Sequence, residues 1–383
     1  MRICVLTPHY PTPKDPYNFM FVHRRAKLYD LEHSVKVYSI NNNVNLNYEY
    51  ENINVVLANE TNARESIVEF NPDVIFIHAP TSKWQSLGYD IPNLVNKLFD
   101  EGYPYAVWIH GQEALIKSIF YPLQKFDRRL PFPADLGRFP LRSLQLASVR
   151  KFLSKTQIRG LPIIFVSDWL RDAVSKSLLL KFEHSKTIPN PIDNRIFSYE
   201  KKPGKYSTKL LSIRPFKPKY AVEDSIRAVA EVSGVHLDIF GDGPGYQRYL
   251  DLINKLDANV KLHRGFLQPE KISSLHTNYG VYLTPSRTDS QGVSMCEAMA
   301  SGLAVISSDT QGIPEFISHG TTGFLTNSIS DLSYYIRYLR DNPDKMQEIG
   351  KQASMAIEQI SGSNTVLNKD LKIAQHLDAK FDN

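Results

Sequence analysis

The sequence predicts an α/β protein built from two doubly wound parallel sheets. Short runs of Val, Ile, Leu and Phe alternate along the chain with segments of helical periodicity. Most of these runs are continuous rather than alternating, which is typical of strands buried on both faces. The length of 383 residues favours two domains. Apolar residues at 42% and charged residues at 22% exclude a disordered chain.

The expected strands fall into two groups. The first group is Arg2–Thr7, Val35–Ile40, Asn54–Ala58, Asp73–His78, Ala106–His110 and Pro162–Val166. The second group is Leu210–Ile213, Leu237–Phe240, Val260–His263, Val281–Thr284 and Ala304–Ser307. Helical segments lie between successive strands, as in the crossover connections of a parallel sheet, and the pattern after Asp331 is helical.

A polar stretch at Phe197–Ser207 separates the two groups and contains Pro-Gly, which is typical of a linker. We therefore place an N-terminal Rossmann-like domain at residues 1–195 and a C-terminal one at residues 196–365. We expect the two domains to face each other across a cleft. Ligands of such sheets bind beyond the carboxyl ends of the strands, so the loops after the strands are the candidate sites.

Cysteine content and hydropathy indicate a reducing compartment. The two cysteines, Cys4 and Cys296, lie in apolar contexts and are too few for a disulfide framework. Residues 1–8 are too short and too early for the apolar core of a signal peptide. No run approaches 18 apolar residues. We expect a cytoplasmic protein.

The net charge of +5 is unevenly distributed. The segment from Ala114 to Arg159 holds ten Lys or Arg residues against Asp127 and Asp135, a local net charge of +8, with six interleaved aromatic residues. Such a segment suits an anionic membrane face or an anionic acceptor. A solvated helical hairpin whose aromatic residues belong to the core is an equal alternative. No nucleic-acid-binding module is visible, so no nucleic-acid partner is expected.

Two carboxylates, Asp289 and Glu297, lie eight positions apart in the loop after Val281–Thr284. Gly292 lies between them and is expected to start a helix that runs through Ala300. The amides of the next residues would then be free first-turn donors, which favour a phosphate or a sugar hydroxyl. These residues are Val293, Ser294 and Met295. Glu297, about a turn further on, can accept from a ribose diol. A capping loop with a surface acid pair is the alternative.

Two cations follow the strand Leu210–Ile213. Arg214 leaves the strand end and Lys219 follows five residues later, with Lys217 as a spare candidate. Such a pair can neutralise a diphosphate, because Arg makes bidentate hydrogen bonds to phosphate oxygens and Lys supplies a compact positive charge. Solvated surface charge is the alternative interpretation.

Two further loops are weaker candidates. The glycine-rich stretch Gly241–Gly245 lacks the spacing of a dinucleotide or Walker loop, and we interpret it as a tight turn. His110 ends a strand of the first domain, where it can donate to a sugar hydroxyl or a diphosphate. A structural histidine is the alternative there.

The motifs of the second half, in their order, resemble those of the retaining GT-B glycosyltransferases of family 4, the glycosyl transferases group 1. The matching stretches are 214–219, 241–244, 264–266, 285–286, 289–297, 297–307, 312–317 and 320–324. The first half matches more loosely, at 110–113, 166–172 and 188–193 with Phe197. The resemblance implies a GT-B fold of two Rossmann-like domains. It also implies that a last helix, at about 366–383, packs back onto the first domain.

The resemblance also implies roles for residues of this chain. Arg214 and Lys219 correspond to the cationic pair on the donor diphosphate, and Glu297 to the acid on the donor ribose. Asp289 stands near the transferred sugar, and His110 contacts that sugar from the first domain. The residues that offer backbone amides to the sugar and the β-phosphate are Gly292, Val293, Ser294 and Met295. The residues that form the wall behind the base are Gly265, Phe266 and Leu267.

Three departures from the family pattern bear on activity. Asp289 replaces the usual Glu and retracts the carboxylate by one methylene. Tyr220 follows Lys219 where the family usually has Gly. The loop after the first strand, residues 8–19, lacks the usual Gly pair, with Asn18 or Phe19 in its place.

The expected function is a metal-independent, retaining transfer of a hexose or N-acetylhexosamine from a nucleotide-diphosphate sugar, UDP favoured over GDP. No cofactor is expected beyond this donor. The expected acceptor is a saccharide or a lipid-linked saccharide in surface polysaccharide or glycoconjugate assembly, at the inner membrane face. The alternative is a non-catalytic sugar-nucleotide or glycan-binding subunit of a partner enzyme.

Overall fold

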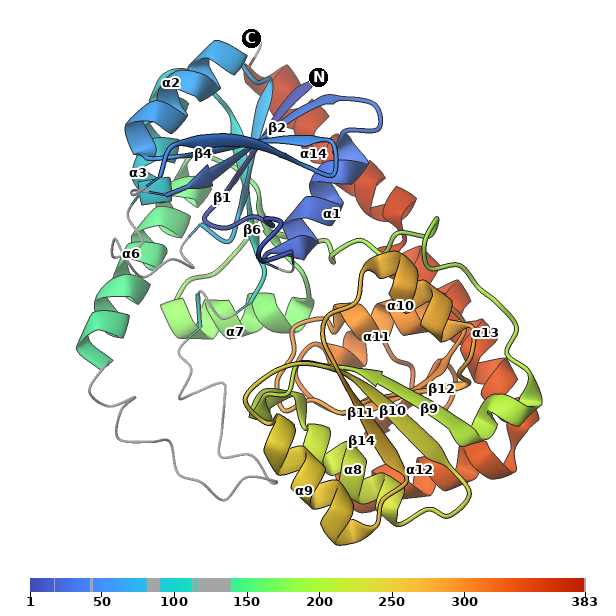
Figure 1. Cartoon of the computed structure of the whole chain (residues 1–383). Coiled ribbons are helices and arrows are strands. Elements are labelled where there is room, and N and C mark those ends of the chain that lie inside the picture. Colours follow the sequence, from blue (N-terminus) through green and yellow to red (C-terminus); the bar gives the residue numbers. More distant parts are fainter. Residues whose placement is uncertain (17, 42–43, 81–89, 112–113, 116–138, 382–383) are drawn as a thin grey trace. The chain divides into compact units, whose positions relative to one another are not determined.

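The computed structural model describes residues 1–16, 18–41, 44–80, 90–111, 114–115 and 139–381 (Figure 1). Within these ranges the chain divides into two compact units. Unit 1 comprises residues 1–191 and 366–383, and unit 2 comprises residues 192–365. Sequence reasoning had placed these boundaries at 195/196 and 365/366.

Unit 1 contains an eight-stranded sheet with the order β3-β4-β2-β1-β5-β6-β7-β8. Its strands are β1 (Arg2–Thr7), β2 (Ser34–Ile40), β3 (Leu46–Tyr50), β4 (Ile53–Ala58), β5 (Val74–His78), β6 (Tyr105–Ile109), β7 (Ile163–Phe165) and β8 (Lys186–Thr187). Its helices are α1 (Met20–Tyr29), α2 (Glu60–Phe70), α3 (Asp90–Asp100), α6 (Phe139–Ile158), α7 (Asp168–Leu178) and α14 (Ser363–Phe381). The central strands are buried along their whole length, as their apolar runs predict.

One strand departs from the expected parallel pattern. β3 pairs antiparallel with β4 at the sheet edge, and four of its five residues are exposed or half-buried. The hairpin turns at Glu51 and Asn52, both in the left-handed region with φ of 45° and 67°. The prediction missed β3 because its sequence, LNYEY, carries no buried apolar run.

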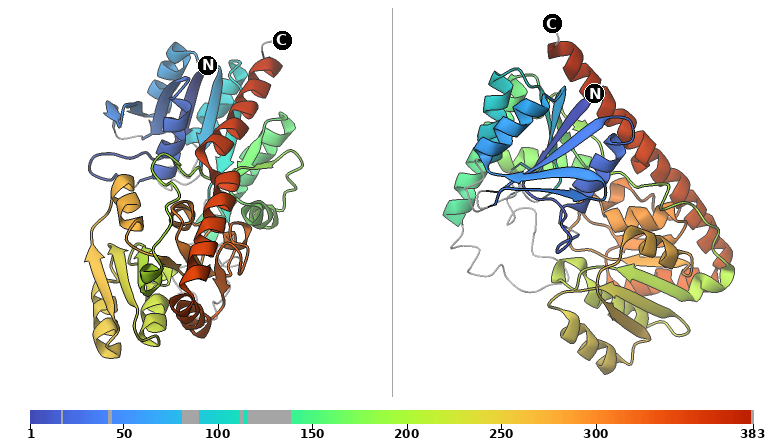
Figure 2. Two further views of the ribbon diagram at one scale, coloured as in Figure 1. Left: turned by 90° about the vertical axis from the view of Figure 1, so that its right-hand side faces the viewer. Right: turned by 45° about the horizontal axis from the view of Figure 1, so that its top comes forward.

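The last helix, α14, lies beside α1 in unit 1 (Figure 1 and Figure 2). Its apolar side chains join the core of this unit, among them Val366 and Leu377. Asp370 is fully buried there, 3.2 Å from Nε of Arg25, and accepts a 2.8 Å hydrogen bond from the Tyr29 hydroxyl. A buried carboxylate requires such partners.

Unit 2 contains a six-stranded parallel sheet with the order β11-β10-β9-β12-β13-β14. Its strands are β9 (Lys209–Ile213), β10 (His236–Gly241), β11 (Val260–Arg264), β12 (Val281–Thr284), β13 (Ala304–Ser308) and β14 (Phe324–Thr326). Its α-helices are α8 (Val222–Ala230), α9 (Tyr246–Leu256), α10 (Pro269–His276), α11 (Val293–Ala300), α12 (Ile329–Asp341) and α13 (Pro343–Ser361). Short 3₁₀ helices are η2 (Gly204–Thr208), η3 (Pro218–Tyr220) and η4 (Ile313–Glu315).

Helices cover both faces of the second sheet, so the doubly wound prediction is confirmed. Leu210 of β9 faces a core that includes residues of α8, α9 and α12, whereas its neighbour Leu211 faces one formed with α10 and α11. Helix α13 contributes to both cores. The stretch expected to be a linker packs against unit 2, because two of its side chains, Phe197 and Lys202, are buried. Cys4 and Cys296 are buried free thiols, as predicted.

Candidate functional site

The candidate site of unit 2 lies at the carboxyl ends of its strands. Arg214 follows β9, Gly241 ends β10, and the loop with Asp289 follows β12. Because the strands are parallel, these ends lie at one edge of the sheet. The parallel arrangement of the strands therefore brings the predicted donor-site residues of this unit to one edge of the sheet.

Arg214 is buried and held by its neighbours. Its side chain is 4% exposed, and Nη2 donates to Oγ1 and to the carbonyl of Thr284 at the end of β12. Its Nη1 lies 3.5 Å from Oδ2 of Asp289, while its buried Nε has no partner among the described residues. A side chain at Gly241 would overlap the Arg214 carbonyl, so the glycine turn after β10 allows Arg214 to lie close against it. This supports the structural interpretation of that turn.

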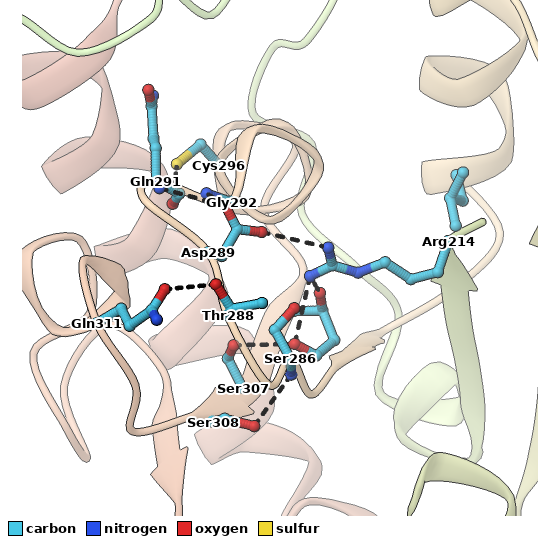
Figure 3. Close-up of polar contacts among 12 residues, drawn as sticks. Arg214, Ser286, Thr288, Asp289, Gln291, Gly292, Cys296, Ser307, Ser308 and Gln311 are labelled. Carbon is cyan, nitrogen blue, oxygen red and sulfur yellow. Dashed lines mark hydrogen bonds and ion pairs between the residues drawn. The ribbon is translucent and has the colours of Figure 1, made fainter. Parts of the chain in front are cut away.

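Asp289 organises the loop that leads into α11 (Figure 3). Its Oδ1 accepts hydrogen bonds from the amides of Gly292, at 2.9 Å, and Gln291, at 3.3 Å. Gly292 has φ 74° and directly precedes α11, and a Cβ there would lie 2.9 Å from Cδ1 of Ile313. The predicted helix start at Gly292 is confirmed. The Gly292 amide, expected as a ligand donor, is already engaged by Asp289.

The first turn of α11 presents backbone donors toward the same loop. No described residue accepts a hydrogen bond from the amides of Val293, Ser294 or Met295 in the structure. The dipole of the helix adds partial positive charge at this end. Glu297 lies one turn further along, with 2% exposure. The arrangement favours a ligand that carries negative charge at the helix start.

Lys219 lies in the turn η3 and is exposed. The amide of Arg287 donates to its carbonyl at 2.9 Å, and Nε of Arg287 donates to the Pro218 carbonyl at 3.0 Å. These bonds tie η3 to the loop after β12. In the described part of the chain, no carboxylate lies within ion-pair distance of the Lys219 ammonium, and its one aromatic contact is the ring of Tyr220.

The proposed base wall lies at the end of β11. Gly265 has φ 112°, and its amide donates to the Gly241 carbonyl at 3.1 Å, which connects it to the turn beside Arg214. Phe266 is 59% exposed, and Leu267 packs against the core of this unit. An exposed aromatic ring at a strand end offers a surface on which a planar base can stack.

His110 belongs to unit 1 and is described there by itself. Its Nε2 lies 2.9 Å from Nδ1 of His78, and its ring lies 4.4 Å from that of Phe21. Burial, with the nearby charge of Arg25, holds the pKa of His110 well below its usual value. The imidazole is therefore neutral at pH 7.

Half of the basic segment 114–159, residues 116–138, lies outside the described residues. Among the side chains of α6 that the structure describes, the exposed basic ones are Arg150, Lys151 and Lys155. Arg159 does not add to that surface, because its side chain is 9% exposed and lies 3.2 Å from Asp100. Phe152 is buried in the core, as the hairpin alternative requires.

The described ranges contain neither a metal-binding cluster nor a membrane-spanning helix. There, no three His, Cys, Asp or Glu residues are grouped so that they could hold a metal ion. Within the same ranges, no helix combines the length and hydropathy needed to cross a bilayer.

The contacts of three residues at the site were not predicted from the sequence. Thr284 and Arg287 bind Arg214 and the η3 turn respectively, and Tyr220 contacts both cations. Thr284 is the last residue of a predicted strand, and this position could have marked it as a residue of the site. Nothing local marks the partners of Arg287 and Tyr220.

Comparisons with known proteins find a family match within unit 2. Residues 195–355 match the family model described as glycosyl transferases group 1. The chain is 28% identical over 178 residues to the sulfoquinovosyl transferase SQD2 of Arabidopsis thaliana, 42% of this chain and 34% of that protein. It is 26% identical over 201 residues to the N-acetyl-alpha-D-glucosaminyl L-malate synthase of Bacillus anthracis, 48% of this chain and 51% of that protein. These alignments thus span about a third and about half of the two relatives.

Solved structures extend the likeness to the whole chain. A sucrose-phosphate synthase from Thermosynechococcus elongatus has a TM-score of 0.74 at 14% identity, over 99% of this chain and 100% of that one. HepE from Anabaena, in complex with UDP and glucose, has a TM-score of 0.69 at 16% identity, over 98% and 100%. At such identities the likeness concerns the fold, which is GT-B. The match over residues 195–355 thus identifies a glycosyl transferases group 1 region within a chain of GT-B fold.

Proposed function

We propose that the protein transfers a hexose or N-acetylhexosamine from a nucleotide-diphosphate sugar to an acceptor hydroxyl, with retention of anomeric configuration. The observation that carries this proposal is the joint placement of Arg214, Lys219 and the start of α11. Two cations and a set of unpaired helix amides lie at the carboxyl ends of one parallel sheet. A diphosphate matches this charge.

In the proposed reaction, the bond between the sugar C1 and the diphosphate oxygen breaks as the acceptor oxygen bonds to C1 on the same face. The acceptor's proton passes to the departing phosphate oxygen. Arg214, Lys219 and the α11 amides stabilise the negative charge that develops on the diphosphate. We propose that no metal takes part, because these groups supply the positive charge, and a chelator would then leave the rate unchanged.

The remaining site residues bind and orient the donor in this proposal. Glu297 accepts from the ribose hydroxyls, and the stretch 265–267 flanks the base. Asp289 fixes the loop around Gly292 and pairs with Arg214. In this proposal it therefore positions the phosphate-binding groups and also lies beside the sugar. His110, as a neutral imidazole, donates or accepts one hydrogen bond with the sugar.

A UDP donor is favoured over GDP in this proposal. Among solved relatives of the same fold, HepE is described in complex with UDP-glucose, and a variant of Staphylococcus aureus TarM in complex with UDP. For the acceptor we propose a saccharide or lipid-linked saccharide used in surface polysaccharide or glycoconjugate assembly. The exposed basic residues of α6 support a peripheral site at the cytoplasmic face of a membrane.

A second candidate is a non-catalytic subunit that binds a sugar nucleotide or glycan for a partner enzyme. The specific observation in its favour is the Asp289 carboxylate, which is occupied by two amides of its own loop and by Arg214. A carboxylate in that state has less capacity left for a sugar hydroxyl.

Thermal unfolding against UDP, GDP, dTDP, ADP and CMP, each with its sugar conjugates, tests the proposal. A ligand at 100 times its dissociation constant adds about 2.7 kcal/mol to the free energy of unfolding. We expect UDP and its sugars to raise the midpoint, followed by transfer to an acceptor in an enzymatic assay. Stabilisation without transfer to any saccharide acceptor would favour the subunit, and the absence of any stabilisation would refute the donor site.

A further inference from the structure

We propose that Tyr220 is a positioning residue whose ring holds both diphosphate-binding cations, Arg214 and Lys219, by cation–π contacts. The guanidinium carbon of Arg214 lies 5.3 Å from the ring centroid, and the Lys219 ammonium lies 4.6 Å from it. Both distances are within the range of a cation–π contact. This inference rests on the proposed function, and it adds Tyr220 to the residues of that site.

The ring is itself held in place. Tyr220 packs against the apolar core of unit 2, and its amide donates to the Lys217 carbonyl at 3.1 Å within the η3 turn. The left-handed position of this turn is Ala221, with φ 48°, so residue 220 is not required to be glycine. The backbone therefore accommodates an aromatic residue at the point where Lys219 leaves the turn.

Lys219 needs such a support more than Arg214 does. Arg214 is buried and already held by Thr284 and Asp289. Lys219 is exposed, and a free lysine side chain loses considerable rotamer entropy when a ligand immobilises it. A ring that already restricts the ammonium lowers this cost for the ligand.

An aromatic ring also preserves the charge that the ligand requires. A carboxylate beside Lys219 would neutralise it, as Asp289 partly neutralises Arg214. A ring face attracts the ammonium without competing for its N–H donors, which stay available to phosphate oxygens. The ligand that this arrangement favours is the diphosphate part of the donor, independent of its base and sugar.

The chain offers a matched control at the other end of the same strand. Tyr206 in η2, which precedes β9, lies beneath two exposed lysines, at 5.7 Å from Lys205 and 4.8 Å from Lys209. It shares the chemistry of Tyr220, but it lies at the amino end of β9, away from the strand end where ligands of such sheets bind.

The test compares wild type, Y220L, Y220F and Y206L by calorimetric titration with UDP, inorganic pyrophosphate and uridine. We expect Y220L to bind UDP and pyrophosphate about tenfold more weakly, equivalent to about 1.4 kcal/mol, with uridine binding unchanged. Y220F, which keeps the ring, and Y206L, which removes the control ring, should bind like wild type. In kinetics, Y220L should lower kcat with the donor at saturation, because the same cations stabilise the leaving group.

Equal binding of pyrophosphate by Y220L and wild type would overturn the inference and leave the proposed function intact. An equal loss of affinity for uridine in Y220L would also overturn the inference, because the ring would then support the packing of the whole site and not the diphosphate-binding cations. If wild type binds pyrophosphate in a Tyr220-dependent way but transfers no sugar, the inference stands and the proposed catalysis is refuted. If wild type binds neither UDP nor pyrophosphate, both are refuted.

Discussion

Substitution of Asp289 tests whether this carboxylate builds the phosphate-binding loop. Its Oδ1 accepts from Gly292 at 2.9 Å and from Gln291 at 3.3 Å, and its Oδ2 lies 3.5 Å from the buried Arg214. A hydrogen bond to a charged group contributes about 1.5–3 kcal/mol, and the two longer contacts contribute less. We expect D289A to lower the free energy of unfolding by about 2–4 kcal/mol.

D289N separates the hydrogen bonds from the charge. Its amide oxygen can still accept from Gly292, but its NH₂ group cannot pair with Arg214, so we expect a loss of about 1–2 kcal/mol. D289E keeps the charge but displaces the carboxylate by one methylene, and its transfer activity reports whether the longer side chain reaches the sugar. Urea denaturation measures stability, and transfer of labelled sugar measures activity.

The exposed Asp341, paired with Arg340 at the end of α12, provides the control D341N. We expect this substitution to change neither stability nor transfer measurably, since exposed ion pairs contribute little. The reasoning is refuted if D289A is as stable as wild type, because the loop would then not depend on this carboxylate. Full transfer activity in D289N would show that its charge is not needed at Arg214.

Three further predictions concern other residues of the chain. K219A and E297A should lose most transfer activity while their circular dichroism spectra stay unchanged; near-normal turnover in either would remove that residue from the site. Burial, with the nearby Lys202, lowers the pKa of His276 to about 3, below the value of about 6.5 in an unfolded chain. Between these values the unfolded chain binds more protons, so the free energy of unfolding falls as the pH falls from about 6.5 to 3. H276Q should flatten this decline in urea titrations, and an unchanged slope would contradict the assignment. The basic segment 114–159 should give salt-sensitive flotation with anionic liposomes, and equal flotation with neutral liposomes would argue against a membrane role.

Strands with continuous apolar runs could be predicted from the sequence. Val281–Thr284 was predicted with the observed bounds of β12, and Arg2–Thr7 with those of β1. The edge strands β3 and β14 and the two-residue β8 were missed, because edge strands are short or polar and owe their conformation to a neighbouring strand.

Local signals also predicted part of the candidate site. A glycine before an apolar segment marked the start of α11, and parallel topology directed attention to Arg214, Lys219 and Asp289. Whether each of these residues acts as proposed stays a prediction.

What the sequence by itself determined is the succession of strands and helices and the chemistry gathered after them, because periodicity and helix-start signals act over a few residues. What only the tertiary structure decided is which atoms meet. From the sequence, the Asp289 carboxylate could accept hydrogen bonds from a sugar or from its own loop. In the structure it accepts from the Gly292 amide and lies beside Arg214. Arg25 pairs with Asp370, far away in the sequence, and Tyr220 contacts Arg214 from the next turn. Such contacts depend on how the elements pack, since the free energy of a buried charge is set by the partners that packing brings to it.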